Sequence, residues 1–207
     1  MRRMDSRKYF IAATAIAAIA TGGWLSWQLM QTPQALLAAT LLPAPAELAE
    51  FSLTDQHGTE FTRDSFKGHW NLVFFGFTHC PDICPLTLQV LADARRQMQE
   101  KGLHVLPRIV LVSVDPERDS PEVLGRYISH FGDGTVGLTG EMEQLRSLTT
   151  KLGIYFQKSG IDGDNYAVDH SAVIIVINPD GKFTALFSAP HEAGNIAHDA
   201  SLLMSRF

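Results

Sequence analysis

The sequence predicts an α/β domain, with a central mixed sheet flanked by helices, preceded by one transmembrane helix. Three observations support this fold class. Short apolar runs rich in β-branched residues alternate with segments of helical spacing, a pattern typical of a sheet covered on both faces. The chain then closes with two strands joined by a turn and a final helix. Its first thirty residues hold a long apolar stretch behind a basic cluster.

The expected strands are short runs bounded by turn residues: 51–58 (a strand entering a turn), 60–62, 71–77, 108–114, 172–177 and 182–187. Helices are expected over 85–101, 120–131, 141–152 and 193–205, with Ser120 as N-cap and Pro121 at the first position of the second. The closing hairpin and helix suit a thioredoxin-like order. The polar segment 157–168 contains two glycines and has little to bury, so we expect it to be mobile.

The N-terminal region divides into three parts. Residues 1–8 form a basic segment that we place in the cytoplasm, and residues 9–30 an apolar transmembrane anchor. Residues 31–46 contain three prolines and no charge, and are interpreted as a linker. A single thioredoxin-like domain is then expected over residues 47–207.

The basic residues stand only before the apolar stretch, so the positive-inside rule places the following domain outside the cytoplasm. We therefore expect a single-pass protein of the inner membrane, with its C-terminal domain in the periplasm. A cleaved signal peptide is the alternative, with residues 36–40 as a late cleavage site. The apolar stretch is long for a signal peptide, and Trp24 and Trp27 suit the far membrane interface.

The charge balance argues against nucleic acid as a partner. The formal net charge is −5, and the N-terminal eight residues carry +3, which leaves −8 for the rest of the chain. An acidic body repels a polyanion.

Both cysteines of the chain, Cys80 and Cys84, lie in the segment 77–85 (FTHCPDICP). A structural disulfide is one interpretation in an exported protein, but so small a ring restricts the unfolded chain little. Each cysteine precedes a proline, and Pro85 suits the first helical position, so we expect Cys84 to be the helix N-cap. Thiolates at a helix N-terminus are stabilised by its free N–H groups. Two soft sulfur ligands favour Cu(I).

A third ligand is expected to be an imidazole, and His170 is the candidate. It lies in the polar triplet Asp169-His170-Ser171, directly before a buried strand, where it has no obvious role in the core. In a thioredoxin-like fold the loop before that strand faces the cysteine loop. His79 neighbours Cys80, but adjacent side chains of an extended segment point apart. The remaining histidines are expected to be ordinary surface or turn residues.

Three segments together resemble the Sco/SenC family of copper chaperones for cytochrome c oxidase assembly. They are 76–85 (GFTHCPDICP), 112–122 (VSVDPERDSPE) and 168–171 (VDHS), and they occur in the family's order. The resemblance covers about residues 47–207 and implies a thioredoxin-like fold. It also implies that Cys80, Cys84 and His170 bind one copper ion per chain, as Cu(I), Cu(II) or both. Asp115 matches an acidic residue of the family and is a possible supporting residue near the metal.

The implied function is delivery of copper to the CuA centre of cytochrome c oxidase, with its copper-bearing subunit or another periplasmic copper protein as the partner. A thiol–disulfide oxidoreductase that reduces cysteines of a copper-receiving protein is the main alternative, because Cys80 and Cys84 can also form a redox disulfide. A peroxidase is disfavoured because both cysteines share one loop. A Cys₂His zinc site is possible by ligand type, but suits this arrangement less well.

Overall fold

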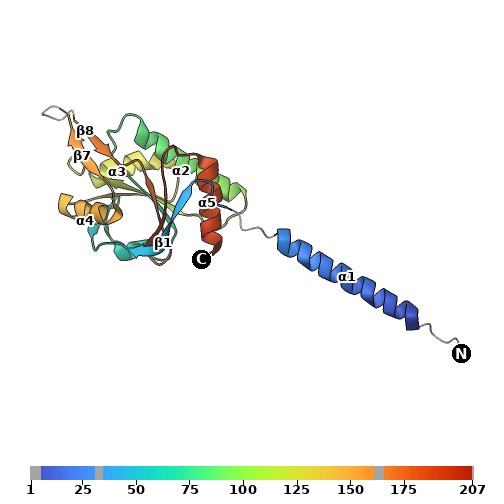
Figure 1. Ribbon diagram of the computed structural model, residues 1–207. Helices are drawn as coiled ribbons and strands as arrows, with labels where there is room; N and C mark the ends of the chain where they lie inside the picture. Colours follow the sequence, from blue (N-terminus) through green and yellow to red (C-terminus); the bar gives the residue numbers. More distant parts are fainter. Residues whose placement is uncertain (1–5, 31–34, 161–165, 207) are drawn as a thin grey trace. The chain divides into compact units, whose positions relative to one another are not determined.

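The computed structural model describes residues 6–30, 35–160 and 166–206 (Figure 1). The chain forms two compact units, the first ending at Ala35 and the second beginning at Leu36. The first unit holds one helix, α1 (Ser6–Met30). Its span from Phe10 to Trp27 is long and apolar enough to cross a membrane, with a mean hydropathy of 1.5. At about 1.5 Å per residue, its 25 residues extend about 37 Å. Its described apolar side chains are exposed, among them Ile16, Ile19 and Trp24.

The second unit is built around an eight-stranded mixed sheet in the order β1-β10-β9-β4-β5-β6-β2-β3. The strands are β1 (Ala39–Glu47), β2 (Ser52–Asp55), β3 (Glu60–Thr62), β4 (Asn71–Gly76), β5 (Arg108–Ser113), β6 (Thr135–Thr139), β9 (Ile174–Ile177) and β10 (Lys182–Phe187). The central strands β4, β5 and β6 are parallel, whereas the pairs toward both edges are antiparallel. The carboxyl ends of β4 and β5 therefore lie at the same edge of the sheet.

Helices cover the sheet on both faces. They are α2 (Ile83–Glu100), α3 (Pro121–Ile128), α4 (Met142–Leu152) and α5 (Ala193–Arg206), with short 3-10 helices at Arg63–Phe66 and Ser129–Phe131. α2, α3 and α5 lie on one side and α4 on the other (Figure 1). Strand β4 is buried along its whole length, as expected for a central strand between two helical layers. A separate two-stranded sheet, β7 (Phe156–Ser159) and β8 (Ala167–His170), forms a hairpin.

Most expected elements are present. Ser120 caps α3, since its Oγ accepts the Val123 N–H at 3.3 Å, and Pro121 begins the helix. Strand β6 was not predicted, because Gly137 interrupts its apolar pattern. The expectation that residues 157–168 are mobile is not tested over the whole segment. Strands β7 and β8 occupy its two ends, and residues 161–165 lie outside the described part of the chain.

The predicted linker over residues 31–46 is wrong in its second half. Residues from Ala39 onward form β1, which pairs with β10 at the edge of the sheet, so the folded unit begins at Leu36 and not near Glu47. The pairing is interrupted between Leu41 and Ala46, where Pro43 and Pro45 lie. Proline is tolerated at such an edge because its missing N–H need not face a neighbour.

A buried carboxylate fixes the start of β1. Asp199 of α5 is fully buried and accepts the backbone N–H groups of Leu37, Ala38 and Ala39 at 2.9, 2.8 and 2.7 Å. His198 Nδ1 lies 2.8 Å from the same carboxylate. Burial alone raises the pKa of Asp199, but these hydrogen bonds outweigh it and hold the pKa below its usual value.

Replacing Asp199 by asparagine should therefore lower the free energy of unfolding at neutral pH by about 1–3 kcal/mol, the usual cost of losing charge-assisted hydrogen bonds. Because the folded-state pKa is depressed, the stabilisation is present above the unfolded pKa of about 3.9 and is lost as the pH falls through the folded value. Denaturant unfolding at a series of pH values from 7 to 3 measures this loss. The free energy of unfolding should decrease less with falling pH for Asp199→Asn than for the wild type. The exposed Asp180→Asn is the control, and an equal decrease for Asp199→Asn would contradict the assignment.

Candidate metal centre

Cys80 and Cys84 lie between β4 and the first turn of α2. Cys80 is half-buried on the loop, and its backbone N–H donates to the Phe77 carbonyl at 3.3 Å. Cys84 is the second residue of α2 and is fully buried. The expectation that Cys84 is the helix N-cap is therefore wrong, since the helix begins at Ile83, two residues earlier than expected, and Asp82 is the N-cap. Pro85 is tolerated inside the first turn because amides there have no partner within the helix.

The helix N-terminus acts on Cys80 and not on Cys84. The Cys84 N–H donates to Cys80 Sγ at 3.4 Å, so the outer sulfur takes the place of an oxygen cap. The Cys84 sulfur instead lies against the sheet, where a Cβ on Gly76 would come within 2.9 Å of it. Gly76 thus provides the space for this sulfur. Burial raises the pKa of the Cys84 thiol well above its usual value, and the Cys80 sulfur raises it further.

His170 is the last residue of β8 and faces the cysteines from the opposite side. Its Nε2 lies 3.4 Å from Cys84 Sγ. Its Nδ1 lies 3.2 Å from the Ser171 carbonyl, which can only accept, so Nδ1 carries the proton and Nε2 presents its lone pair to the sulfurs. The rings of Phe74 and Phe77 pack edge-on against the imidazole. Burial lowers the pKa of His170, which keeps the imidazole neutral and able to bind a metal.

The structure brings the three expected ligands together. One atom from each of Cys80, Cys84 and His170 lies within 4.8 Å of the other two, a separation that one ion can bridge after small movements. His79 is not part of this group and is 54% exposed. His191 was expected to be a surface residue, and this is wrong. It is half-buried, and its Nε2 lies 3.0 Å from the Ala172 carbonyl.

The expected supporting residue, Asp115, follows β5 and is fully buried. It lies outside the group of three ligands. Its carboxylate accepts the Tyr166 hydroxyl at 2.5 Å and pairs with the Arg118 guanidinium. Asp115 therefore acts through these two side chains in this structure and not on the sulfurs directly.

Asp119 supports the cysteine loop, a role that the sequence analysis missed. It is fully buried and accepts both the backbone N–H and the hydroxyl of Thr78, at 3.0 and 2.5 Å, and the Ser113 hydroxyl at 2.6 Å. It thereby fixes the loop just before Cys80. The only signal in the sequence is its place in the segment 112–122, in which only Asp115 was considered as a site residue.

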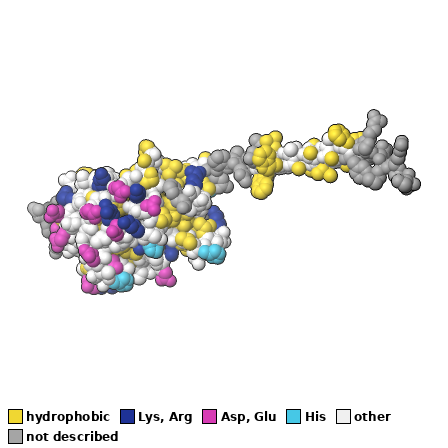
Figure 2. All heavy atoms as spheres, turned by 90° about the horizontal axis from the view of Figure 1, so that it is seen from below, with side chains coloured by type: hydrophobic (Ala, Val, Ile, Leu, Met, Phe, Trp, Pro, Cys, Tyr) yellow, Lys and Arg dark blue, Asp and Glu magenta, His cyan; other side chains and the backbone are white. Residues whose placement is uncertain are grey.

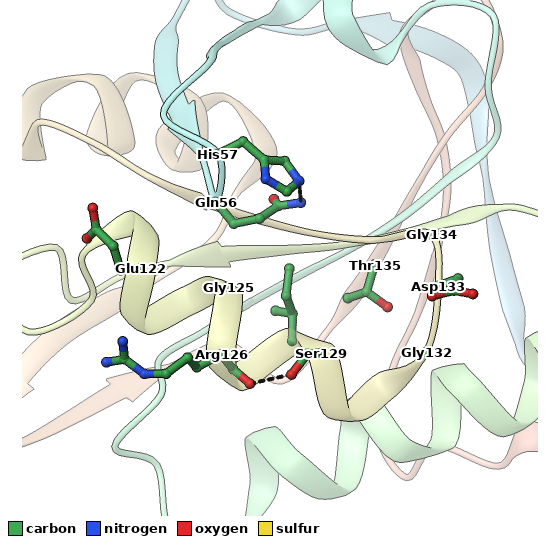
Figure 3. A pocket seen from close by; sticks show the side chains of 11 residues that line it. Gln56, His57, Glu122, Gly125, Arg126, Ser129, Gly132, Asp133, Gly134 and Thr135 are labelled. Atoms are coloured by element: carbon green, nitrogen blue, oxygen red, sulfur yellow. Dashed lines mark hydrogen bonds between the residues drawn. The ribbon is translucent and has the colours of Figure 1, made fainter.

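Among the described residues, two of the surface hollows lie apart from the three ligands. One, of about 640 Å³, lies between the turn after β2 and helix α3, with Gln56 and His57 on one side and Arg126 and Ser129 on the other (Figure 3). The other, of about 680 Å³, lies beside β7 and includes Arg146 and Lys158. Neither is lined by Cys80, Cys84 or His170, so neither adds a ligand to the group.

The fold and this group of side chains define a thioredoxin-like protein with two thiols and an imidazole at the carboxyl edge of its sheet. Residues 40–205 match the SCO1/SenC family, and the chain belongs to this family.

Sequences and solved structures of relatives agree with this assignment. The chain is 35% identical over 202 residues to the Bos taurus protein named Protein SCO2 homolog, mitochondrial, covering 95% of this chain and 76% of that protein. The crystal structure of Arabidopsis thaliana ScoI with copper bound matches 78% of this chain and 100% of its own, at 32% identity and a TM-score of 0.74. The structure of Bradyrhizobium japonicum ScoI with copper bound matches 77% of this chain and 99% of its own, at 34% identity and a TM-score of 0.67.

The different surroundings of the two thiols predict different reactivity. In the reduced protein, Cys80 (probed in the Cys84→Ser variant) should react with iodoacetamide faster than Cys84 (probed in Cys80→Ser). The difference should be at least about tenfold near neutral pH, since each unit by which a thiol pKa rises reduces its thiolate fraction about tenfold. Mass spectrometry of timed samples measures both rates. In denaturant the rates should converge, and equal rates in the folded proteins would contradict the assigned burial of Cys84.

Proposed function

We propose that this protein is a copper chaperone that binds one copper ion through Cys80, Cys84 and His170 and transfers it to another protein. The observation that carries the proposal is the convergence of the three ligand atoms within 4.8 Å. Two thiolates and a neutral imidazole suit Cu(I), and the nitrogen also makes Cu(II) binding possible. Copper is the cargo of this reaction and not a resident cofactor.

The geometry supports transfer as well as binding. Cys80 is partly exposed on the loop before the helix, whereas Cys84 is fully buried behind it. A ligand from a receiving protein therefore reaches the ion first on the side of Cys80. We propose cytochrome c oxidase as the recipient, at the CuA centre of its copper-bearing subunit, with another periplasmic copper protein as the alternative recipient. The family membership and the copper-bound relatives support this choice.

We place the protein in the inner membrane, with α1 as a single-pass anchor and the folded domain in the periplasm. The apolar span from Phe10 to Trp27 and the basic cluster before it support this topology. On the face of the domain in Figure 2, acidic and basic side chains are interspersed, which does not suit a nucleic acid partner.

A thiol–disulfide oxidoreductase is the second candidate, and one observation favours it. Cys80 on the loop and Cys84 in the first turn of α2 bring their sulfurs within 4.8 Å of each other. Attack by Cys80 on a partner's disulfide, followed by attack of Cys84 on the mixed disulfide, would leave Cys80 and Cys84 oxidised and the partner reduced. This chemistry needs no imidazole, so His170 separates the two candidates.

Replacing His170 by alanine should weaken Cu(II) binding by more than about tenfold, a loss of more than about 1.4 kcal/mol, because a nitrogen ligand is lost. Cu(I) should still bind through the two thiolates, although less tightly. Absorption and electron paramagnetic resonance spectra of the Cu(II) protein should lose their nitrogen signature. Cells that carry only this variant should fail to mature the oxidase.

The exposed His79→Ala variant is the matched control and should behave as the wild type. The double variant Cys80→Ser/Cys84→Ser should bind no Cu(I). Unchanged Cu(II) spectra in His170→Ala would remove this residue from the coordination sphere. Normal oxidase assembly with His170→Ala would place the oxidoreductase function first.

The full-length protein should be recovered in the membrane fraction, and a reporter fused after Phe207 should be active only in the periplasm, because the charge asymmetry around residues 9–30 directs the C-terminus outward. Alkaline phosphatase and green fluorescent protein fusions distinguish the two sides. Moving the basic residues 2, 3, 7 and 8 to the far end of the apolar stretch should reverse or scramble the result. A reporter active only in the cytoplasm would refute the topology.

A further inference from the structure

The position of His170 depends on a hairpin that is not part of the main sheet. Strands β7 and β8 pair only with each other among the described strands, with Phe156 opposite His170. At the base of the hairpin, the Ser171 N–H donates to the Tyr155 carbonyl at 2.9 Å. The side chain of Val168 anchors β8 in the core, and a polar contact attaches β8 to the turn after β5.

Arg118 and Tyr166 supply that contact. Tyr166 directly precedes β8, and the Arg118 guanidinium lies over its ring, 3.7 Å from the ring centroid. Arg118 Nη1 also donates to the Tyr166 carbonyl at 3.1 Å, and the Tyr166 hydroxyl donates to buried Asp115 at 2.5 Å. Lys158 Nζ, from β7, also lies 4.5 Å from the centroid of the Tyr166 ring. One end of β8 is thus attached by stacking and by two hydrogen bonds.

The same turn of chain holds the cysteine side of the site. Asp115 and Arg118 bind Tyr166, whereas Asp119, one residue further, binds Thr78 before Cys80. Arg118 also faces Phe77, at 5.8 Å from its ring centroid, and Phe77 packs against the imidazole of His170. The two segments that carry the ligands are therefore fixed to each other through five residues of the chain.

We infer that Arg118 and Tyr166 are positioning residues that set the distance between His170 and the two sulfurs, and thereby the affinity of the site for Cu(II). Neither side chain is among the three ligands. This inference rests on the proposed function, since it assigns a role in the same site. Groups that orient metal ligands typically change metal affinity by about 10–100-fold when they are removed.

The affinity for Cu(II) should depend on this contact more than the affinity for Cu(I). The two sulfurs come from the loop before α2 and from its first turn, and they keep their separation without the hairpin, so two-coordinate Cu(I) binding survives. Cu(II) needs the nitrogen, which the hairpin carries. Tyr166 is partly exposed, and its loss leaves the ion pair between Arg118 and Asp115 in place, so it should affect global stability less than the loss of a core residue.

The test uses a graded pair of variants in the full chain. Tyr166→Phe removes the hydrogen bond to Asp115 but keeps the ring over Arg118, and Tyr166→Ala removes both. Cu(II) affinity should fall in the order wild type, Tyr166→Phe, Tyr166→Ala, with about a tenfold loss for the last. Arg118→Lys, which keeps the charge but loses the planar stacking, should resemble Tyr166→Ala. Tyr155→Ala is the matched control, because Tyr155 is an exposed tyrosine at the base of the same hairpin.

A second measurement needs no copper. In the metal-free protein, backbone amides of β7 and β8 should exchange hydrogen faster in Tyr166→Ala than in Tyr155→Ala, while those of β4 and β5 remain unchanged. If the wild type binds no copper, the proposed function fails, and the exchange data still test whether Tyr166 holds the hairpin. If copper binds but Tyr166→Ala keeps the affinity and nitrogen signature of the wild type, the positioning role is refuted, whatever the exchange rates. Equal exchange in Tyr166→Ala and Tyr155→Ala would refute it as well.

Discussion

The geometry of the site depends on the hydrogen-bond partners of two buried carboxylates. Asp115 and Asp119 follow the central strand β5 and are fully buried, where an unpaired charge would be costly. The backbone turn between them is closed by the Asp119 N–H, which donates to the Asp115 carbonyl at 3.0 Å. Their side chains are satisfied by groups from distant segments, Asp119 by Thr78 and Asp115 by Tyr166. Satisfying both carboxylates therefore brings the cysteine loop and the histidine hairpin to the same place.

The sheet also brings the loops of the site together. Strands β4 and β5 are parallel and in register, with Gly76 opposite Ser113, so the loops that follow them leave from one edge. Open α/β sheets place their sites at that edge for this reason. Gly76 ends β4 without a side chain, and the Cys84 sulfur occupies the space. The Ser113 hydroxyl donates to Asp119, which links the end of β5 to the same loop.

The sequence predicted the features that local patterns encode and missed those that depend on distant partners. The runs that form β4, β5 and β9 are apolar and β-branched, so they are recognisable, and the cysteine spacing with the Asp169-His170-Ser171 triplet indicated all three candidate ligands. Strand β1 was missed because two prolines and a lack of charge are typical of a linker, and only its partner β10 makes it a strand. The contact between Arg118 and Tyr166 joins residues 48 apart, and neither has a local pattern that points to the other.

The two cysteines differ in a way that links the metal chemistry to the redox chemistry. Cys80 is partly exposed and accepts a helix amide, whereas Cys84 is buried behind it with a raised pKa. In the proposed transfer, an incoming ligand therefore displaces Cys80 before the buried Cys84. Oxidation follows the same order, because the exposed sulfur meets an oxidant or a partner's disulfide before the buried one does. Disulfide formation consumes both thiolates, so the oxidised protein cannot hold Cu(I), and the chain can carry copper only while it is kept reduced.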